Sequence, residues 1–384
     1  MNLKSVIIFG LLLRLLIAPF FYHPDIKSQY FHFQFLSQGV YNIYDYLEKD
    51  RLTLPYQDTF NYQPLTYLVF GTINIFLSPL YPADFYVWIN DWGPDQNNYP
   101  NLPIFLLILK LPYLLLDLGI GYLLYRKLGQ KPLLLWLFNP FSLYFIYVLG
   151  NFDIIPVFLT VLAWYFFDTR KSLSFLFLGI ATSLKLYPLL FLPFFIFFKT
   201  KDISKNLFFF LLPVALSTLP FLSSNSFLHS FVGSGLSQKV FELKLYSLPL
   251  FPLIYGLIFI KYIISSSKNI PLSLTYVFLL FISTVSFHGQ WLLWFIPFIL
   301  ISTHKSLPKI FFFVATLTLS LLYLLLTDDK YLVWGHFIPV DTQFIYQPYP
   351  YQYILHRFLI NPVIFQNYLK IIIGLLSTLF FLVK

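Results

Sequence analysis

The chain has 384 residues, of which 58% are hydrophobic, 22% aromatic and only 11% charged. These proportions exclude an ordinary water-soluble globule, which cannot bury so much apolar surface. The absence of cysteine excludes a disulfide framework, a thiolate metal site and a cysteine nucleophile. Apolar runs of membrane-spanning character recur from residue 3 to residue 383, which predicts an all-α, polytopic transmembrane protein.

The formal net charge of +9 would suggest a nucleic-acid partner in a soluble protein, but its distribution points to topology instead. Fourteen of the 25 Lys and Arg residues lie in short loops or at the two ends, together with only two acids, Asp168 and Asp202. Short loops rich in Lys and Arg mark the cytoplasmic side of a membrane. We therefore expect cytoplasmic termini and no nucleic-acid partner. These basic residues are Lys4, Arg126, Lys127, Lys131, Arg170, Lys171, Lys199, Lys201, Lys205, Lys261, Lys268, Lys305, Lys309 and Lys384.

The first predicted span, residues 1–22, runs outward and leads into a long extracytoplasmic loop, residues 23–100. This loop holds eight of the sixteen acids. Its apolar piece, residues 64–80, would place residues 126–131 outside if it crossed the membrane, against the positive-inside rule. We expect it to lie in the outer interface, and whether it crosses is left open.

Residues 101–327 are predicted to form membrane helices joined by short loops. Between two basic loops, residues 172–198 must go out and return in two limbs that are each too short for a full span of roughly 20 residues. We expect broken helices here, with Lys185 at the outer turn, because irregular backbone at this depth needs protein or a wet cavity around it.

An outer loop and interfacial segment, residues 328–368, is expected to precede the last span, residues 369–384. About 10–12 spans then form one integral-membrane domain over residues 1–384. No internal repeat is evident, which disfavours inverted-repeat transporters.

Ionisable residues inside membrane spans are costly and need a physical reason. We expect Arg14 to pair with Asp117 and brace two spans. Lys110 is expected to extend along the helix surface to the outer interface, as long cationic side chains do near the ends of spans.

Polar residues from five spans are expected at the same outer level: Asp25, Lys110, Asp153, Lys185, His288 and Gln290. Each has an ordinary alternative, such as a helix N-cap for Asp153 or a loop carboxylate for Asp25. Their convergence favours an extracytoplasmic site. If the protein is an enzyme, Asp25 is the residue expected to carry the chemistry.

A series of motifs covers about three quarters of the chain, residues 13–297. In their order and spacing they resemble the GT-C superfamily of integral-membrane glycosyltransferases. The resemblance is greatest to the GPI mannosyltransferase I catalytic subunit and to bacterial polyprenyl-phosphate-mannose-dependent mannosyltransferases. The motifs are Leu13-Arg14, Asp25-Ile-Lys27, Asn61-Tyr-Gln-Pro-Leu65, Lys110 with Asp117, Leu123-Leu-Tyr-Arg126, Trp136-Leu-Phe-Asn-Pro140, Gly150-Asn-Phe-Asp153, Lys185-Leu-Tyr-Pro188, and Gln290-Trp-Leu-Leu-Trp294 with Pro297.

The resemblance implies transfer of a hexose, with mannose expected, from a polyprenyl-phosphate donor to a lipid-linked or cell-envelope acceptor on the extracytoplasmic face. Asp25 would act as the general base of an inverting reaction. Lys185 would stabilise the leaving phosphate, with His356 and Arg357 as further candidates. The residues expected to bind substrate are Tyr62, Gln63, Asp153, Lys185, Tyr187, His288 and Gln290.

The first-loop motif of this family is often Asp-x-Asp, and here Lys27 stands where the second acid would be. This departure argues against a metal bridge through the motif, so no metal site and no obligatory cofactor is predicted, and a divalent metal is left open. Two other classes of function are also left open. A transporter or flippase of lipid-linked saccharides would need polar groups in both membrane halves, and a non-catalytic partner of another transferase would not need Asp25.

Overall fold

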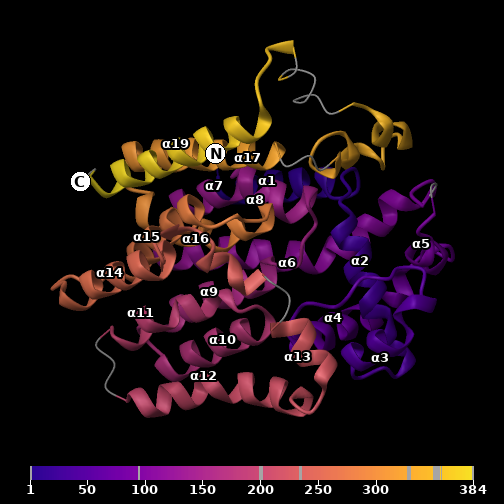
Figure 1. Ribbon diagram of the computed structural model, residues 1–384, viewed down its shortest axis with the longest axis horizontal. Coiled ribbons are helices and arrows are strands. Elements are labelled where there is room, and N and C mark those ends of the chain that lie inside the picture. Colours follow the sequence, from indigo (N-terminus) through magenta and orange to yellow (C-terminus); the bar gives the residue numbers. More distant parts are fainter. Residues whose placement is uncertain are drawn as a thin grey trace.

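The computed structural model describes residues 2–93, 96–198, 202–232, 236–326, 330–348, 355 and 357–382. Regular structure in these ranges is almost entirely helical (Figure 1). The strands described are the short antiparallel pair β1 (Lys244–Leu245) and β2 (Leu248–Pro249). The predicted all-α class is therefore confirmed.

The helices lie side by side in stacked layers, mostly along the long axis of the molecule (Figure 1). In chain order they are α1 (Leu3–Ile17), α2 (Pro24–Phe33), α3 (Ile43–Asp50), α4 (Pro64–Leu77), α5 (Phe85–Asn90), α6 (Leu102–Leu128), α7 (Gln130–Leu137), α8 (Pro140–Leu143), α9 (Ile154–Phe166), α10 (Lys171–Leu184), α11 (Leu192–Ile196), α12 (Ile203–Thr218), α13 (Asn225–Val232), α14 (Leu250–Ile264), α15 (Ile270–Thr284), α16 (Ile296–Thr303), α17 (Leu307–Leu325) and α19 (Pro362–Leu382).

Four helices in the described part of the chain are long and apolar enough to cross a membrane: α6, α12 with the 3₁₀ turn that follows it, α17 and α19. Five more apolar segments have 10–17 residues. Within residues 101–327, the apolar run at about 132–149 is long enough to predict one span, but it is broken into α7, α8 and a π-helical turn, Tyr144–Val148. The break falls at Asn139-Pro140, because proline cannot continue the hydrogen bonding of α7.

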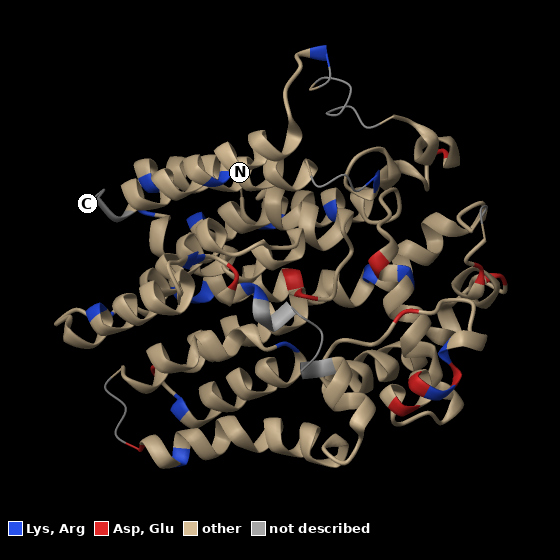
Figure 2. Ribbon diagram, in the orientation of Figure 1, with Lys and Arg blue, Asp and Glu red and all other residues tan. Residues whose placement is uncertain are grey.

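Helices α2 to α5 come from the long first loop and form one end of the molecule (Figure 1). Asp and Glu residues gather there, whereas the opposite end, with the free end of α14, carries mainly Lys and Arg (Figure 2). Between these ends, α10 packs against α9 on one side and α12 on the other. Helix α10 stops at Leu184, and Lys185 is extended with φ −155° and ψ 140°. The expected break at Lys185 is therefore present.

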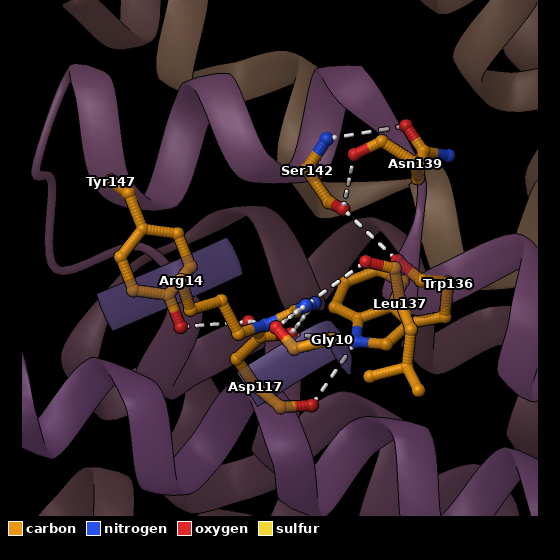
Figure 3. Close-up of polar contacts among 8 residues, drawn as sticks. All are labelled: Gly10, Arg14, Asp117, Trp136, Leu137, Asn139, Ser142 and Tyr147. Carbon is orange, nitrogen blue, oxygen red and sulfur yellow. Dashed lines mark hydrogen bonds and ion pairs between the residues drawn. The ribbon is translucent and has the colours of Figure 1, made fainter. Parts of the chain in front are cut away.

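Arg14 and Asp117 lie in contact in the buried interior (Figure 3). Both side chains are fully buried, and Nε of Arg14 lies 2.5 Å from Oδ2 of Asp117. Arg14 also donates to the carbonyl oxygens of Gly10 and Leu137, each at 2.9 Å. The guanidinium therefore ties α1 to α6 and to the end of α7.

The Asp117 carboxylate is satisfied by further donors from the broken helix (Figure 3). Nε1 of Trp136 donates to Oδ1 at 2.7 Å, and the hydroxyl of Tyr147 donates to Oδ2 at 2.8 Å. Oδ1 of Asn139 caps α8 by accepting from the backbone N–H of Phe141 and Ser142, at 2.9 Å and 3.2 Å. The Trp136-to-Pro140 motif thus has a packing role in this structure.

Lys110 does not extend to the outer interface, so that expectation was wrong. Its side chain is buried, and Nζ donates to the carbonyl oxygens of Ala18, Phe21 and Tyr147 at 2.8, 2.6 and 2.7 Å. Carbonyl groups at the end of a helix lack intrahelical donors. Lys110 supplies that donor beyond the C-terminus of α1, because it lies on the inward face of α6.

Gly179 sets the close approach of α10 to α12. A Cβ atom at this position would lie 2.2 Å from the backbone oxygen of Phe210, which cannot rotate away. We expect Gly179→Ala to lower the free energy of unfolding by about 1–3 kcal/mol, as measured by thermal unfolding in detergent. Gly256→Ala in α14 is the control: its Cβ would meet nothing within 4 Å, so alanine should stabilise the helix slightly. Equal effects of the two substitutions would contradict the close packing.

His32 on α2 provides a test of pH dependence. It is buried, with no hydrogen-bond partner described for Nε2, and burial lowers its pKa to about 4. Between pH 6.5 and pH 4 the unfolded chain therefore binds more protons at this residue, so acidification through that window lowers the free energy of unfolding. We expect His32→Phe to remove up to about 3 kcal/mol of this loss, measured as thermal unfolding at pH 4.5 and 7.0. His229→Phe, which replaces an exposed histidine, should leave the pH dependence unchanged.

Candidate functional site

A cavity of about 470 Å³ opens beside the break after α10. Its walls come from the N-terminus of α2, the segment before α4, the turn after α10, and the end of α15 with the 3₁₀ helix Gly289–Trp294. Seven of the eight residues predicted to react with or bind substrate line this one cavity. They are Asp25, Tyr62, Gln63, Lys185, Tyr187, His288 and Gln290.

Asp25 lies in the first turn of α2, behind Pro24 and the N-cap residue His23. Partial positive charge at a helix N-terminus stabilises an anion there. Nδ2 of Asn151 donates to Oδ2 at 3.2 Å, and Nδ1 of His23 accepts from the backbone N–H of Asp25 at 3.3 Å. The side chain keeps 35% of its surface exposed. Asp25 is therefore held in place from two sides and still accessible from the cavity.

Asp153, the eighth predicted residue, lies behind the cavity wall and is fully buried. Its Oδ1 pairs with Nζ of Lys185, and Nε1 of Trp294 donates to its Oδ2 at 2.7 Å. The side chain makes no capping hydrogen bond to α9, so the N-cap alternative is wrong. Asp153 instead holds Lys185 against the cavity wall.

The Lys185 ammonium group is enclosed by aromatic rings as well as paired with Asp153. Nζ lies 5.1–5.5 Å from the ring centroids of Tyr62, Phe152 and Trp294, within the range of cation–π attraction. Only 12% of the side chain is exposed. The charge of Lys185 is thus largely balanced within the protein, before any ligand enters.

An aromatic row forms one face of the cavity. The rings of Tyr187 and Trp294 stack with centroids 4.2 Å apart and an interplanar angle of 6°, and Trp291 stacks on Trp294 at 5.2 Å and 22°. The three rings are buried against one another and give this wall of the cavity a fixed shape.

Gln63 is held by the backbone of the helix break. In the amide orientation that satisfies both groups, Nε2 donates to the Leu184 oxygen at 2.8 Å and Oε1 accepts from the Leu186 N–H at 3.0 Å. The hydroxyl of Thr66 donates to the same Leu184 oxygen at 2.6 Å. These bonds join the start of α4 to the end of α10 and so position Lys185.

Lys27 does not line the cavity. Its Nζ donates to the backbone oxygens of Asp91 and Gln96 and lies 5.2 Å and 4.9 Å from the rings of Trp88 and Trp92. Burial lowers the pKa of Lys27 to about 7. The residue at the place of the second acid thus fastens α2 to the segment after α5. In the described part of the chain, no group of three or more His, Asp or Glu side chains could hold a metal ion.

Three residues at the site were not predicted from the sequence: His23, Asn151 and Lys239. Asn151 lies within a quoted motif, between Gly150 and Asp153, and that position was the available signal. Lys239 lies 3.1 Å from Nε2 of His288, but a single lysine in an outer loop gives no such signal. Of the two further phosphate candidates, Arg357 is exposed and does not line the cavity, and His356 lies outside the described residues.

Comparisons with protein-family models, with curated proteins and with solved structures find no match for this chain.

Proposed function

We propose that this chain is an integral-membrane glycosyltransferase of GT-C type. It would move a hexose, with mannose as the first candidate, from a polyprenyl-phosphate donor to a lipid-linked or cell-envelope acceptor. The observation that carries this proposal is the cavity itself. A partly exposed carboxylate, Asp25, shares it with residues from two other helix ends, Lys185 and His288.

The two sides of the cavity suit the two parts of such a donor. Leu189, Leu190, Phe281 and Val285 give an apolar wall for a prenyl chain, whereas Asp25 and the amide and imidazole groups form a polar end. The volume of about 470 Å³ lies within the roughly 300–1,000 Å³ typical of ligand sites. An amphipathic ligand of this kind is supported better than a wholly polar one.

In the proposed reaction, Asp25 takes the proton of an acceptor hydroxyl as that oxygen attacks the anomeric carbon of the donor sugar. The new glycosidic bond forms as the bond between the anomeric carbon and the phosphate oxygen breaks, with inversion. Polyprenyl phosphate leaves with the electron pair. His23 holds the backbone of Asp25 and Asn151 holds its carboxylate, so that the geometry of Asp25 is set before substrate binds.

The proposal places both termini in the cytoplasm and the cavity on the extracytoplasmic face. The separation of acidic and basic ends supports this topology (Figure 2), since basic loops stay inside.

Single introduced cysteines test this topology, because the chain has no cysteine of its own that could be labelled. We expect Glu48→Cys in α3 and Asp202→Cys before α12, both exposed, to react with a membrane-impermeant maleimide from opposite sides. Labelling from the same side would contradict the topology.

Transfer itself is tested with the purified full chain in lipid vesicles. A panel of polyprenyl-phosphate hexoses would be offered with a crude lipid and glycan acceptor fraction, and products identified by mass. The proposal expects transfer from one of these donors. A flippase would move labelled donor between leaflets without forming product, and a non-catalytic partner would do neither alone.

A further inference from the structure

A second cation lies at the edge of the cavity, apart from Lys185. Lys239 belongs to the 3₁₀ helix Leu236–Phe241, and its neighbour Val240 lines the cavity together with His288 and Trp291. Nζ of Lys239 lies 3.1 Å from Nε2 of His288 and 5.3 Å from the centroid of the Trp291 ring.

The charge balance of the two lysines differs. Lys185 has its own buried carboxylate, Asp153. None of the ion pairs found among the described residues involves Lys239. The acid one turn away, Glu242, accepts a hydrogen bond from the hydroxyl of Ser286 at 2.6 Å and also faces Lys370 of α19. Lys239 and Lys370 therefore share the field of one carboxylate, Glu242, which leaves net positive charge at this edge of the cavity.

The electrostatics of the pair favour an added anion. Burial lowers the pKa of Lys239, and burial together with the charge of Lys239 lowers the pKa of His288 to about 4. Both shifts show that positive charge is disfavoured here, although the charges of Asp25 and Glu242 act in the opposite direction. The ammonium group of Lys239 has three N–H donors, of which His288 accepts one. An oxyanion beside the pair would accept hydrogen bonds from the others and offset that cost, because charge-assisted hydrogen bonds are the strong ones.

We propose that Lys239 and His288 form an oxyanion-binding subsite of the cavity, and that its ligand is the phosphate of a lipid phosphate. The identity of this ligand as the donor and leaving group of sugar transfer rests on the function proposed above, whereas the anion site itself does not. The apolar residues Val240 and Val285 line the same cavity and would contact the first prenyl units. Lys185, the lysine expected from the sequence to bind phosphate, would instead hold the cavity wall in place through Asp153.

The test measures binding of three probes to the purified full chain: farnesyl phosphate, farnesol and inorganic phosphate. For Lys239→Gln we expect roughly a tenfold or larger rise in the Kd of farnesyl phosphate, since a hydrogen bond to a charged group is lost. The Kd of farnesol should stay unchanged. Lys239→Arg should bind within a few-fold of the original chain, and Lys244→Gln, an exposed lysine in the same loop, is the matched control.

Each outcome of this test decides something. An unchanged Kd for farnesyl phosphate in Lys239→Gln, or an equal loss of farnesol, overturns the subsite. Inorganic phosphate bound as tightly as farnesyl phosphate overturns the lipid as ligand. If Lys239→Gln fails to fold, His288→Gln is measured instead, with the same expectation. If the original chain transfers no sugar but Lys239→Gln weakens its binding of farnesyl phosphate, the subsite is upheld and the proposed transferase is refuted. If Lys239→Gln transfers sugar normally and binds farnesyl phosphate normally, the transferase is upheld and the subsite is refuted.

Discussion

Asp25→Asn is expected to lower sugar transfer by about 10²–10⁴-fold, the usual contribution of a positioned general base. The amide has the shape of the carboxylate but cannot take up the acceptor proton. Because Asp25 is partly exposed and bonded at the edge of α2, the substitution should leave the thermal unfolding midpoint nearly unchanged. Initial rates with saturating donor, measured on protein of verified fold, give the comparison.

Asp50→Asn is the matched control, since it makes the same chemical change at the end of α3 in the same outer segment. It should retain full activity. If Asp25→Asn is as active as this control, Asp25 is not the base, and another group must take the acceptor proton. Loss of activity together with loss of fold would instead assign Asp25 a structural role.

The side chains of the cavity could be predicted from the sequence because polar groups near a membrane cost free energy and are therefore rare there. Polar groups such as Asp25, Lys185 and His288 are expensive near a membrane, so their shared level along the spans pointed to one site. Their pairings were harder to predict. Whether Lys185 meets Asp153 or a ligand depends on how α9 and α10 are rotated, and spacing along a single chain does not determine that rotation.

The lengths of the helices were predicted less well than the all-α fold class. The apolar run at about 132–149 reads as one span, but the capping side chain of Asn139 and the ring of Pro140 divide it. Lys110 was misjudged for a related reason. Its position in the outer half of α6 suits an exposed lysine. Only the fold brings to it two carbonyl oxygens beyond α1 and a third from the π-helical turn.

Arg14→Met is expected to lower the free energy of unfolding by about 3–5 kcal/mol, because it leaves the buried carboxylate of Asp117 without its counter-ion. Trp136 and Tyr147 would still donate to that carboxylate, but neither carries a charge. Chemical unfolding in detergent measures the loss. Arg126→Met, at the exposed end of α6, removes an arginine without this partner and should cost far less.

The double variant Arg14→Met with Asp117→Leu separates a lost charge pair from lost packing. It should recover much of the stability, because an apolar pair of similar volume often replaces a buried ion pair at little cost. Transfer per folded molecule should stay near the original value in both variants, since Arg14 contacts Asp117 and helix carbonyls (Figure 3) and does not line the cavity. A fall in transfer by folded Arg14→Met protein, with stability unchanged, would instead place Arg14 in the reaction.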